Sequence, residues 1–216
     1  MKTFPHFNFE KPLWEQDFLV AGIDEVGRGS FAGPLVVAGV ILHPITDPST
    51  LKFLLSFGIN DSKLISAKKR KMLKNITQEY ILYTSIQSID VDIINEKGIG
   101  KANKLGFQRV AQDLIISAKS LSRLELFFLT DAFQIPEVDT TRQKNIIRGD
   151  STSITIALSS ILAKIQRDTY MEELGITFPQ YGFEKHKGYG TKFHREKIKE
   201  LGACMHHRTE FVKHYI

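Results

Sequence analysis

FLVAGIDEVGRG, residues 18–29, is an apolar stretch that closes on two acids and runs into a glycine-rich turn. Residues 18–24 have the composition of a buried β-strand. A second apolar run, Leu35–Leu42, follows the turn, so two connected strands are predicted. Two interpretations stay open for Asp24 and Glu25: they form part of a metal site, or they begin a turn.

Hydrophobic periodicity predicts the remaining elements. Three more strands are expected at residues 80–89, 125–130 and 144–147. Helices are expected at residues 66–79, with Ser66 as the N-cap, and at 101–119, 154–165 and 191–201. The first three strands can pair as hairpins, and helices alternate with strands after them. This order predicts a mixed sheet with helices packed on it.

The charge pattern suits a protein that contacts phosphates. The formal net charge is +5, and Lys and Arg gather in two blocks. Residues 61–74 carry six Lys or Arg against one acid, and residues 179–216 carry eight against four. Two basic surfaces are typical of nucleic-acid binding, although solvated helix faces show the same pattern.

Composition also argues against several classes of protein. The single cysteine, Cys204, excludes an internal disulfide. The longest apolar run, Leu35–Leu42, is far shorter than the stretch of about 20 residues that spans a bilayer. The first residues lack the apolar run of a secretory signal. A cytoplasmic protein that binds no membrane is therefore expected.

Three predicted strands end on or near acids: Asp24 with Glu25, Asp131, and Asp150. Neighbouring strand ends of one sheet can bring such residues together. Carboxylates about 5 Å apart repel by roughly 3 kcal/mol per pair at an effective dielectric of about 20, so a cluster needs a compensating charge. Hard oxygen ligands favour Mg²⁺ or Mn²⁺, and two such ions can cleave a phosphodiester. The alternatives are a turn at Asp131 and a helix N-cap at Asp150.

The Gly27-Arg28-Gly29 turn has a chemistry of its own. Glycines allow a backbone to approach a ligand closely and to adopt positive φ. Such an approach would let the turn inspect a ribose 2′-hydroxyl, and Arg28 has the reach to contact a phosphate. A tight connection between two strands is the alternative.

The block AGIDEVGRGSFAGPLVVAGVIL, residues 21–42, resembles the opening of bacterial ribonuclease HII, in the type 2 ribonuclease H family. Further blocks that resemble the same family follow in order. They are Asn-Asp-Ser-Lys at 60–63, Leu-Thr-Asp at 129–131, Arg-Gly-Asp at 148–150 with SSILAK at 159–164, and YGFEKHKGYGT at 181–191.

This resemblance implies an α/β protein with a ribonuclease H-like fold: a mixed five-stranded sheet flanked by helices, with a small helical C-terminal extension. Residues 18–178 are expected to form the catalytic domain and residues 179–216 a substrate-binding extension of it. The implied catalytic and metal-binding residues are Asp24, Glu25, Asp131 and Asp150, which would hold two Mn²⁺ or Mg²⁺ ions. The implied substrate-binding residues are Gly27, Arg28, Gly29, Lys63, Lys164 and Tyr189.

The implied activity is hydrolysis of the RNA strand of RNA–DNA hybrids. It includes cutting 5′ to ribonucleotides embedded in duplex DNA, leaving 3′-hydroxyl and 5′-phosphate ends. A monomer is expected. Two other functions stay open: a hybrid-binding protein without catalysis, and another two-metal nuclease such as a junction resolvase.

A few residues fall outside this pattern. Ala132 stands where the family usually has glycine, and Asp168, an alternative fourth acid, is expected in a buried salt bridge beside Arg167 or Lys164. Cys204 is expected to be an unreactive thiol. Five histidines are expected at phosphates or on the surface rather than around zinc, because no second cysteine supports such a site. They are His186, His194, His206, His207 and His214.

Overall fold

The computed structural model describes residues 4–121 and 124–216 and is built on one five-stranded sheet. The strands are β1 Phe18–Val26, β2 Leu35–Leu42, β3 Ile81–Ile89, β4 Glu125–Asp131 and β5 Gln143–Ile146, in the spatial order β3-β2-β1-β4-β5. β1, β2 and β3 pair antiparallel, whereas β1, β4 and β5 pair parallel. The predicted mixed sheet and its five strands are confirmed.

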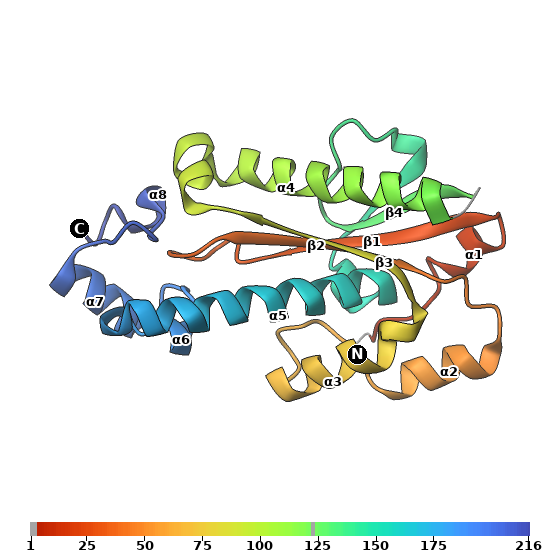
Figure 1. Cartoon of the computed structure of the whole chain (residues 1–216), viewed down its shortest axis with the longest axis horizontal. Helices are drawn as coiled ribbons and strands as arrows, with labels where there is room; N and C mark the ends of the chain where they lie inside the picture. Colours follow the sequence, from red (N-terminus) through yellow and green to blue (C-terminus); the bar gives the residue numbers. More distant parts are fainter. Residues whose placement is uncertain (1–3, 122–123) are drawn as a thin grey trace.

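Two long helices cover the two faces of the sheet: α4 Val91–Leu121 on one and α5 Ile154–Thr177 on the other (Figure 1). Alternate residues of β1 serve the two faces. Val20 packs in the α5-side core, and Ala21 packs in the α4-side core. The same alternation sends the adjacent side chains of Asp24 and Glu25 to opposite faces.

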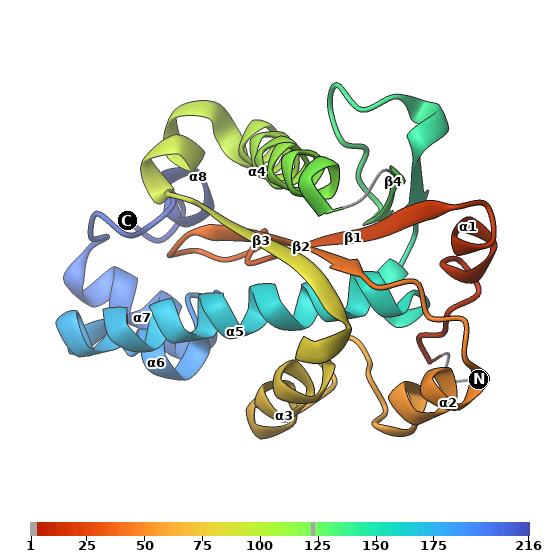
Figure 2. The ribbon, with the colours of Figure 1, turned by 45° about the vertical axis from the view of Figure 1, so that its right-hand side comes forward.

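Shorter helices complete the α5 side: α3 Ala67–Thr77 packs against α5, and α2 Pro48–Ser56 contributes Leu51 and Leu54 to the same core (Figure 2). Ser66 caps α3 as predicted, because its hydroxyl accepts the N–H of Lys69 at 3.2 Å. The helix ends two residues before the predicted 79, and a 3-10 turn, Gln78–Tyr80, follows it. Neither α2 nor α1, Lys11–Trp14, was predicted.

The prediction for residues 101–119 was ten residues too short at its start. α4 begins at Val91 and passes through Gly98, whose φ of 76° interrupts the helical backbone. Because Gly98 and Gly100 lower helix propensity there, periodicity alone did not reveal the first turns.

The last part of the chain gathers at the end of the molecule where α5 finishes (Figure 1). It contains α6 Phe183–His186, α7 Lys192–Leu201 and α8 Thr209–Val212. α7 is the predicted helix, with Thr191 as its N-cap, whereas α8 was not predicted. Within the described ranges, no helix combines the length and apolarity needed to cross a bilayer.

Candidate metal centre

Asp24 lies at the carboxyl end of β1 and is only 2% exposed. Its Oδ1 accepts the N–H of Glu25 at 2.7 Å, and the Ser160 hydroxyl of α5 donates to the same carboxylate. The Ser62 hydroxyl lies 2.9 Å from that of Ser160, so two buried serines support one acid. Burial first, and the charge of Asp131 second, raise the pKa of Asp24 to about 7.

Asp131 ends β4, the parallel neighbour of β1, and its Oδ1 accepts the N–H of Gly149 at 2.8 Å. Asp150 follows in a 3-10 turn, Gly149–Ser151, and is buried. One oxygen from each of Asp24, Asp131 and Asp150 lies within 4.8 Å of the other two. Three of the four predicted acids therefore form one cluster.

The helix-cap interpretation of Asp150 is wrong. Ser153 is the N-cap of α5, since its hydroxyl accepts the N–H of Ile156 at 3.3 Å. Asp150 instead accepts the Ser151 hydroxyl at 3.2 Å and faces the other acids. Burial, followed by the charges of Asp61 and Asp131, raises its pKa.

Glu25 lies outside this close group, because its side chain leaves β1 toward the other face of the sheet. Its Oε2 is buried and has no hydrogen-bond partner among the described residues. Burial first, then the charges of Asp24 and Asp131, raise the pKa of Glu25 to about 9. A buried carboxylate oxygen without a donor is the kind of atom that a bound cation satisfies.

Lys63 lies at the rim of the cluster, with Nζ 3.8 Å from Asp150 Oδ2 and 3.9 Å from Asp61 Oδ1. Its side chain is 61% exposed, so it can also reach a ligand. Asp61, Ser62 and Ser160 were not singled out from the sequence. Each lies inside a block that resembles the family, and that position was the available signal.

The residues of this site fit a hard divalent cation. Three carboxylates meet, the Lys63 ammonium lies beside Asp150, and Glu25 adds a further unpartnered oxygen. Oxygen-only donors of this charge are typical of Mg²⁺ and Mn²⁺ sites. The raised pKa values of Asp24 and Glu25 report the cost of ionising these acids with no cation present.

The Gly27–Gly29 turn follows β1 directly. Gly27 has φ 92°, and a Cβ there would collide with the Arg167 side chain, so only glycine fits. The Arg28 guanidinium carbon lies 4.7 Å from the centre of the Phe133 ring. Gly29 is exposed, and apart from its chain neighbours no described residue has an atom within 4 Å of the position that its Cβ would take. A ligand can therefore approach this backbone closely.

Tyr189 lies above α5, with its ring 5.8 Å from Lys164 Nζ and 5.4 Å from the Arg167 guanidinium carbon. The Lys164 ammonium is bound to Asp168 at 2.6 Å, and Asp168 also pairs with Arg70 at 3.0 Å. The expected salt bridge of Asp168 is thus formed by Lys164 and not by Arg167. Because Lys164 is already paired, its charge is less available to a phosphate.

The surface expectation is wrong for His194 and His207, which are 0% and 2% exposed. His194 Nδ1 lies 3.0 Å from the Tyr189 carbonyl oxygen and must donate to it. His194 Nε2 therefore accepts from His207 Nε2 at 3.0 Å, and His207 Nδ1 accepts the N–H of Cys204 at 2.9 Å. Burial lowers the pKa of both rings to about 4, so this relay is neutral and supports the backbone of Tyr189.

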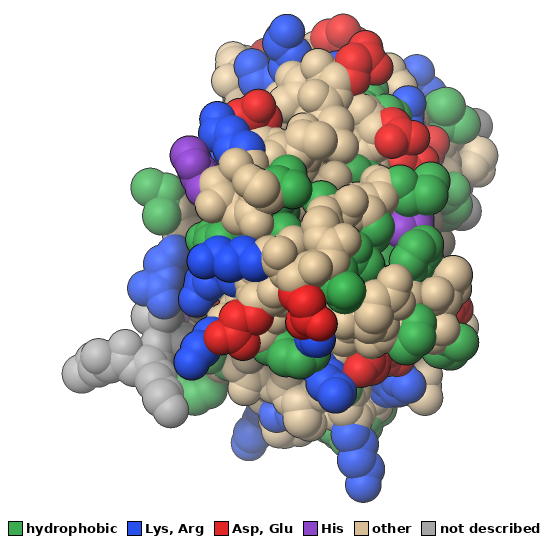
Figure 3. Space-filling model, turned by 90° about the vertical axis from the view of Figure 1, so that its left-hand side faces the viewer, with side chains coloured by type: hydrophobic (Ala, Val, Ile, Leu, Met, Phe, Trp, Pro, Cys, Tyr) green, Lys and Arg blue, Asp and Glu red, His purple; other side chains and the backbone are tan. Residues whose placement is uncertain are grey.

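The two basic blocks differ in the structure. On the face that carries the C-terminal elements, acidic side chains lie among the basic ones (Figure 3). Cations of this block pair with nearby acids, as Lys187 does with Glu172 at 2.7 Å. By contrast Lys68, Lys71 and Lys74 of α3 are exposed and form no ion pair within the described chain. Of the two blocks, the one on α3 therefore presents the larger group of exposed lysines without an acidic partner among the described residues.

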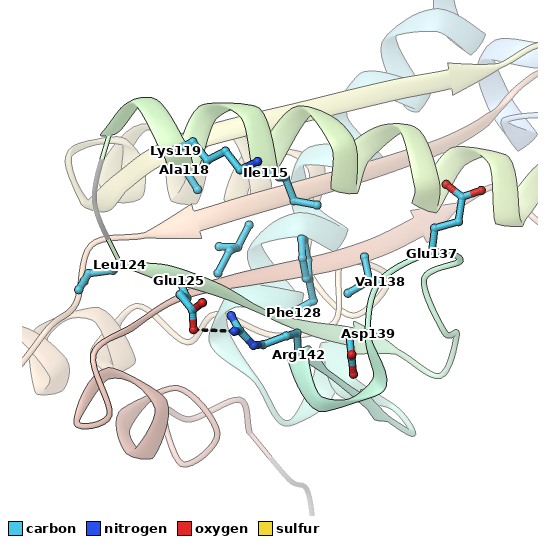
Figure 4. Close-up of a pocket in the computed structure, with 11 residues that line it drawn as sticks. Ile115, Ala118, Lys119, Leu124, Glu125, Phe128, Glu137, Val138, Asp139 and Arg142 are labelled. Atoms are coloured by element: carbon cyan, nitrogen blue, oxygen red, sulfur yellow. Dashed lines mark ion pairs between the residues drawn. The ribbon is translucent and has the colours of Figure 1, made fainter.

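A cavity of about 600 Å³ lies away from the acids, between the last turns of α4 and β4 (Figure 4). Ile115 and Phe128 line it, and Arg142 pairs with Glu125 across it at 2.6 Å. No residue of the acidic cluster contributes to this cavity, so cavity size does not locate the site.

Comparison with known proteins places this geometry in context. The family model described as Ribonuclease HII matches residues 21–215. The chain is 40% identical over 208 residues to a ribonuclease HII of Clostridium perfringens (strain 13 / Type A), covering 96% of this chain and 71% of that protein. It is 36% identical over 213 residues to the ribonuclease HII of Caldicellulosiruptor bescii, covering 98% and 95% of the two chains.

Solved structures share the fold at lower identity. The ribonuclease HII from the PCNA complex of Archaeoglobus fulgidus superposes with a TM-score of 0.69 at 24% identity, covering 90% of this chain and 94% of that one. Bst-RNase HIII in complex with Mn²⁺ superposes with a TM-score of 0.70 at 20% identity, covering 92% and 69%. These likenesses support the predicted fold.

Proposed function

This chain belongs to the ribonuclease HII family, and from that membership we propose that it cuts 5′ to ribonucleotides, including single ones embedded in duplex DNA. It is a ribonuclease H, a metal-dependent endonuclease that hydrolyses RNA in RNA–DNA hybrids. The proposed products carry 3′-hydroxyl and 5′-phosphate ends. The carboxylate cluster of Asp24, Asp131 and Asp150 is the observation that carries this proposal.

We assign Asp24, Glu25, Asp131 and Asp150 as the catalytic ligands of two divalent ions, Mg²⁺ or Mn²⁺. Bound by these residues, two such ions would supply activation of a water molecule and stabilisation of the leaving oxygen of a phosphodiester. The protein contributes by holding the carboxylate ligands in fixed orientations. Ser160 orients Asp24, and the N–H of Gly149 orients Asp131.

We assign the substrate contacts to residues that surround the acidic cluster. Gly29 offers exposed backbone for a ribose, and the ring of Tyr189 is available for a sugar or base. Arg28 and Lys63 are exposed cations beside the acids, placed for the backbone phosphates. Lys164 is assigned a supporting role under Tyr189, because Asp168 already neutralises it.

The free lysines of α3 are proposed to contact a more distant part of the same duplex. Lys68, Lys71 and Lys74 carry charge without acidic partners, which favours phosphate binding that weakens with salt. A monomer is sufficient for these assignments, since one chain supplies every residue named.

The proposal is tested with matched duplexes that carry zero, one or four ribonucleotides, each with and without Mg²⁺ or Mn²⁺. We expect metal-dependent cutting 5′ to the ribonucleotide and none of the all-DNA duplex. Asp24→Asn should remove cleavage while leaving duplex binding largely intact. Asp17→Asn, the same change at an exposed position before β1, should leave cleavage unaffected.

Other outcomes would favour other functions. Salt-sensitive binding without any metal-dependent product would indicate a hybrid-binding protein. Cutting of an all-DNA junction, but not of the ribonucleotide duplex, would indicate a junction resolvase. Full activity of Asp24→Asn would remove Asp24 from the site.

A further inference from the structure

Arg208 and Arg167 are fully buried arginines with no carboxylate partner among the described residues. Burying a guanidinium is costly unless its donors are satisfied. Here backbone carbonyl oxygens accept the hydrogen bonds that the two guanidinium groups donate. Arg167 donates to the carbonyls of Pro34, Ala32 and Lys187 at 2.7 to 3.0 Å. Both arginines therefore connect loops through hydrogen bonds to backbone carbonyls. The sequence did not indicate this role for either residue.

Arg208 reaches the turn that follows β1. Its Nε and Nη2 donate to the Gly33 carbonyl at 3.0 and 2.8 Å, and its Nη1 donates to the Arg28 carbonyl at 3.0 Å. Its own N–H donates to the Phe31 carbonyl at 2.7 Å. Arg208 therefore binds the connection between β1 and β2 near both of its ends, at Arg28 and at Gly33, from the buried side.

The contact with the Arg28 carbonyl fixes the orientation of one peptide group. In a planar trans peptide, the C=O and the following N–H point in opposite directions. Because Arg208 binds the Arg28 carbonyl from the buried side, the Gly29 N–H must point away from the core. This N–H has no acceptor among the described residues, and Gly29 is exposed.

A guanidinium bound to the carbonyl also polarises the peptide. Hydrogen bonds in series strengthen one another, so the Gly29 N–H becomes a better donor than an isolated amide. Burial lowers the pKa of Arg208 to about 9, which leaves it charged at neutral pH. The Gly29 N–H is therefore a donor of fixed orientation that can bind an acceptor oxygen of a ligand.

We propose that Arg208 is the positioning residue that directs the Gly29 N–H at the ribose 2′-oxygen of the substrate, and so sets the preference for a ribonucleotide. This inference rests on the proposed function of the same site. A phosphate oxygen offers the same acceptor chemistry, but it is present in DNA and RNA alike. Two duplexes that differ only in one 2′-hydroxyl therefore distinguish binding of the ribose 2′-oxygen from binding of a phosphate oxygen.

The test measures binding to two labelled duplexes, one all-DNA and one with a single ribonucleotide, with every protein in an Asp24→Asn background. Arg208→Lys keeps the charge but replaces the planar guanidinium, whose three nitrogens bind the carbonyls of Arg28 and Gly33, by a single flexible ammonium. We expect the ribonucleotide preference to fall about 3- to 10-fold, the size of one hydrogen bond, with little change in binding to DNA. A merely structural role would not change this ratio.

Val212→Ala is the matched control, because Val212 is a buried side chain in the helix that follows Arg208. It should lower thermal stability and leave the preference intact. A preference unchanged in Arg208→Lys, or equal weakening for both duplexes, overturns the inference while the proposed function stands. No preference in the Asp24→Asn parent overturns both.

A second measurement does not depend on the folding of Arg208→Lys. In the protein with Arg208 intact, the Gly29 amide proton is followed by NMR during titration with each duplex. We expect a downfield shift with the ribonucleotide duplex and little shift with DNA. No shift, or the same shift with both, overturns the proposal.

Discussion

His194 and His207 share one proton between their Nε2 atoms, 3.0 Å apart, in the interior of the C-terminal elements. The pair is oriented from both ends, by the Tyr189 carbonyl and by the N–H of Cys204. A third ring, His186, stacks on His194 with centres 4.1 Å apart. A positive charge is disfavoured here, because protonation of either ring would break a hydrogen bond of the relay.

The first prediction concerns the pH dependence of stability. The folded pKa values of His194 and His207, about 4, lie below the ordinary value of 6.5. Between these values the unfolded chain binds more protons at these two rings, so their contribution to the free energy of unfolding should fall as pH drops from 6.5 to about 4, whereas the raised pKa values of Asp24 and Glu25 contribute with the opposite sign. Urea unfolding across this range measures the slope, which His207→Gln should reduce. The exposed His43→Gln is the control, and an identical slope in all three proteins would contradict the prediction.

The second prediction is that Asp24→Asn stabilises the metal-free protein. With a folded pKa of about 7 against an ordinary 3.8, ionised Asp24 destabilises the folded state above neutral pH. At about pH 8 in a chelator we expect the melting temperature to rise by several degrees, on a scale of about 2–4 °C per kcal/mol. Asp17→Asn should not change it. A lower melting temperature in Asp24→Asn would show that its hydrogen bonds outweigh the repulsion.

The third prediction concerns ion binding itself. Mg²⁺ or Mn²⁺ should raise the melting temperature, because an ion that binds only the folded state stabilises it by mass action. The shift should increase with ion concentration and be largely lost in Asp24→Asn and Asp150→Asn. An unchanged shift in both variants would place the bound ion elsewhere. Calorimetry without nucleic acid makes this test independent of cleavage.

The fourth prediction is that Ala132→Gly stabilises the protein. Ala132 follows Asp131 with φ 60°, a left-handed conformation that costs a non-glycine residue about 1–2 kcal/mol. Glycine removes this cost, but its greater conformational freedom in the unfolded chain offsets part of the benefit. We therefore expect the free energy of unfolding to rise by about 0.5–1 kcal/mol. Ala102→Gly, at a buried position in α4, should instead destabilise. Denaturant unfolding compares the two variants, and loss of stability in Ala132→Gly would contradict the prediction.

Local pattern was enough to predict much of the fold. β2 matches its predicted bounds, and β1, β3, β4 and β5 lie within two residues of theirs. Ser66 was recognisable as a cap, and the structure confirms it. These features depend on residues near in sequence, where side-chain periodicity and capping act directly. The start of α4 was missed because glycines weaken that local signal.

The acids show where sequence reasoning stops. Asp24, Glu25, Asp131 and Asp150 were identifiable as candidates, because each lies at or near the end of a strand. Their mutual distances depend on the strand order, which puts β4 beside β1 although about 100 residues separate them in sequence. The pairing places Asp24 and Asp131 together, and the alternation of β1 turns Glu25 away.

By itself, the sequence determined the five strands, the helices α3 and α7 and parts of α4 and α5, the family blocks, and the kinds of atom available for a metal. Only the tertiary structure decided which polar groups are buried and what satisfies them. Arg208 and His207 look like surface residues in a charged, histidine-rich segment, yet both are buried against loops that are distant in sequence. Burial makes each of their donors and acceptors costly to leave unpaired, and the partners come from contacts that no local pattern records.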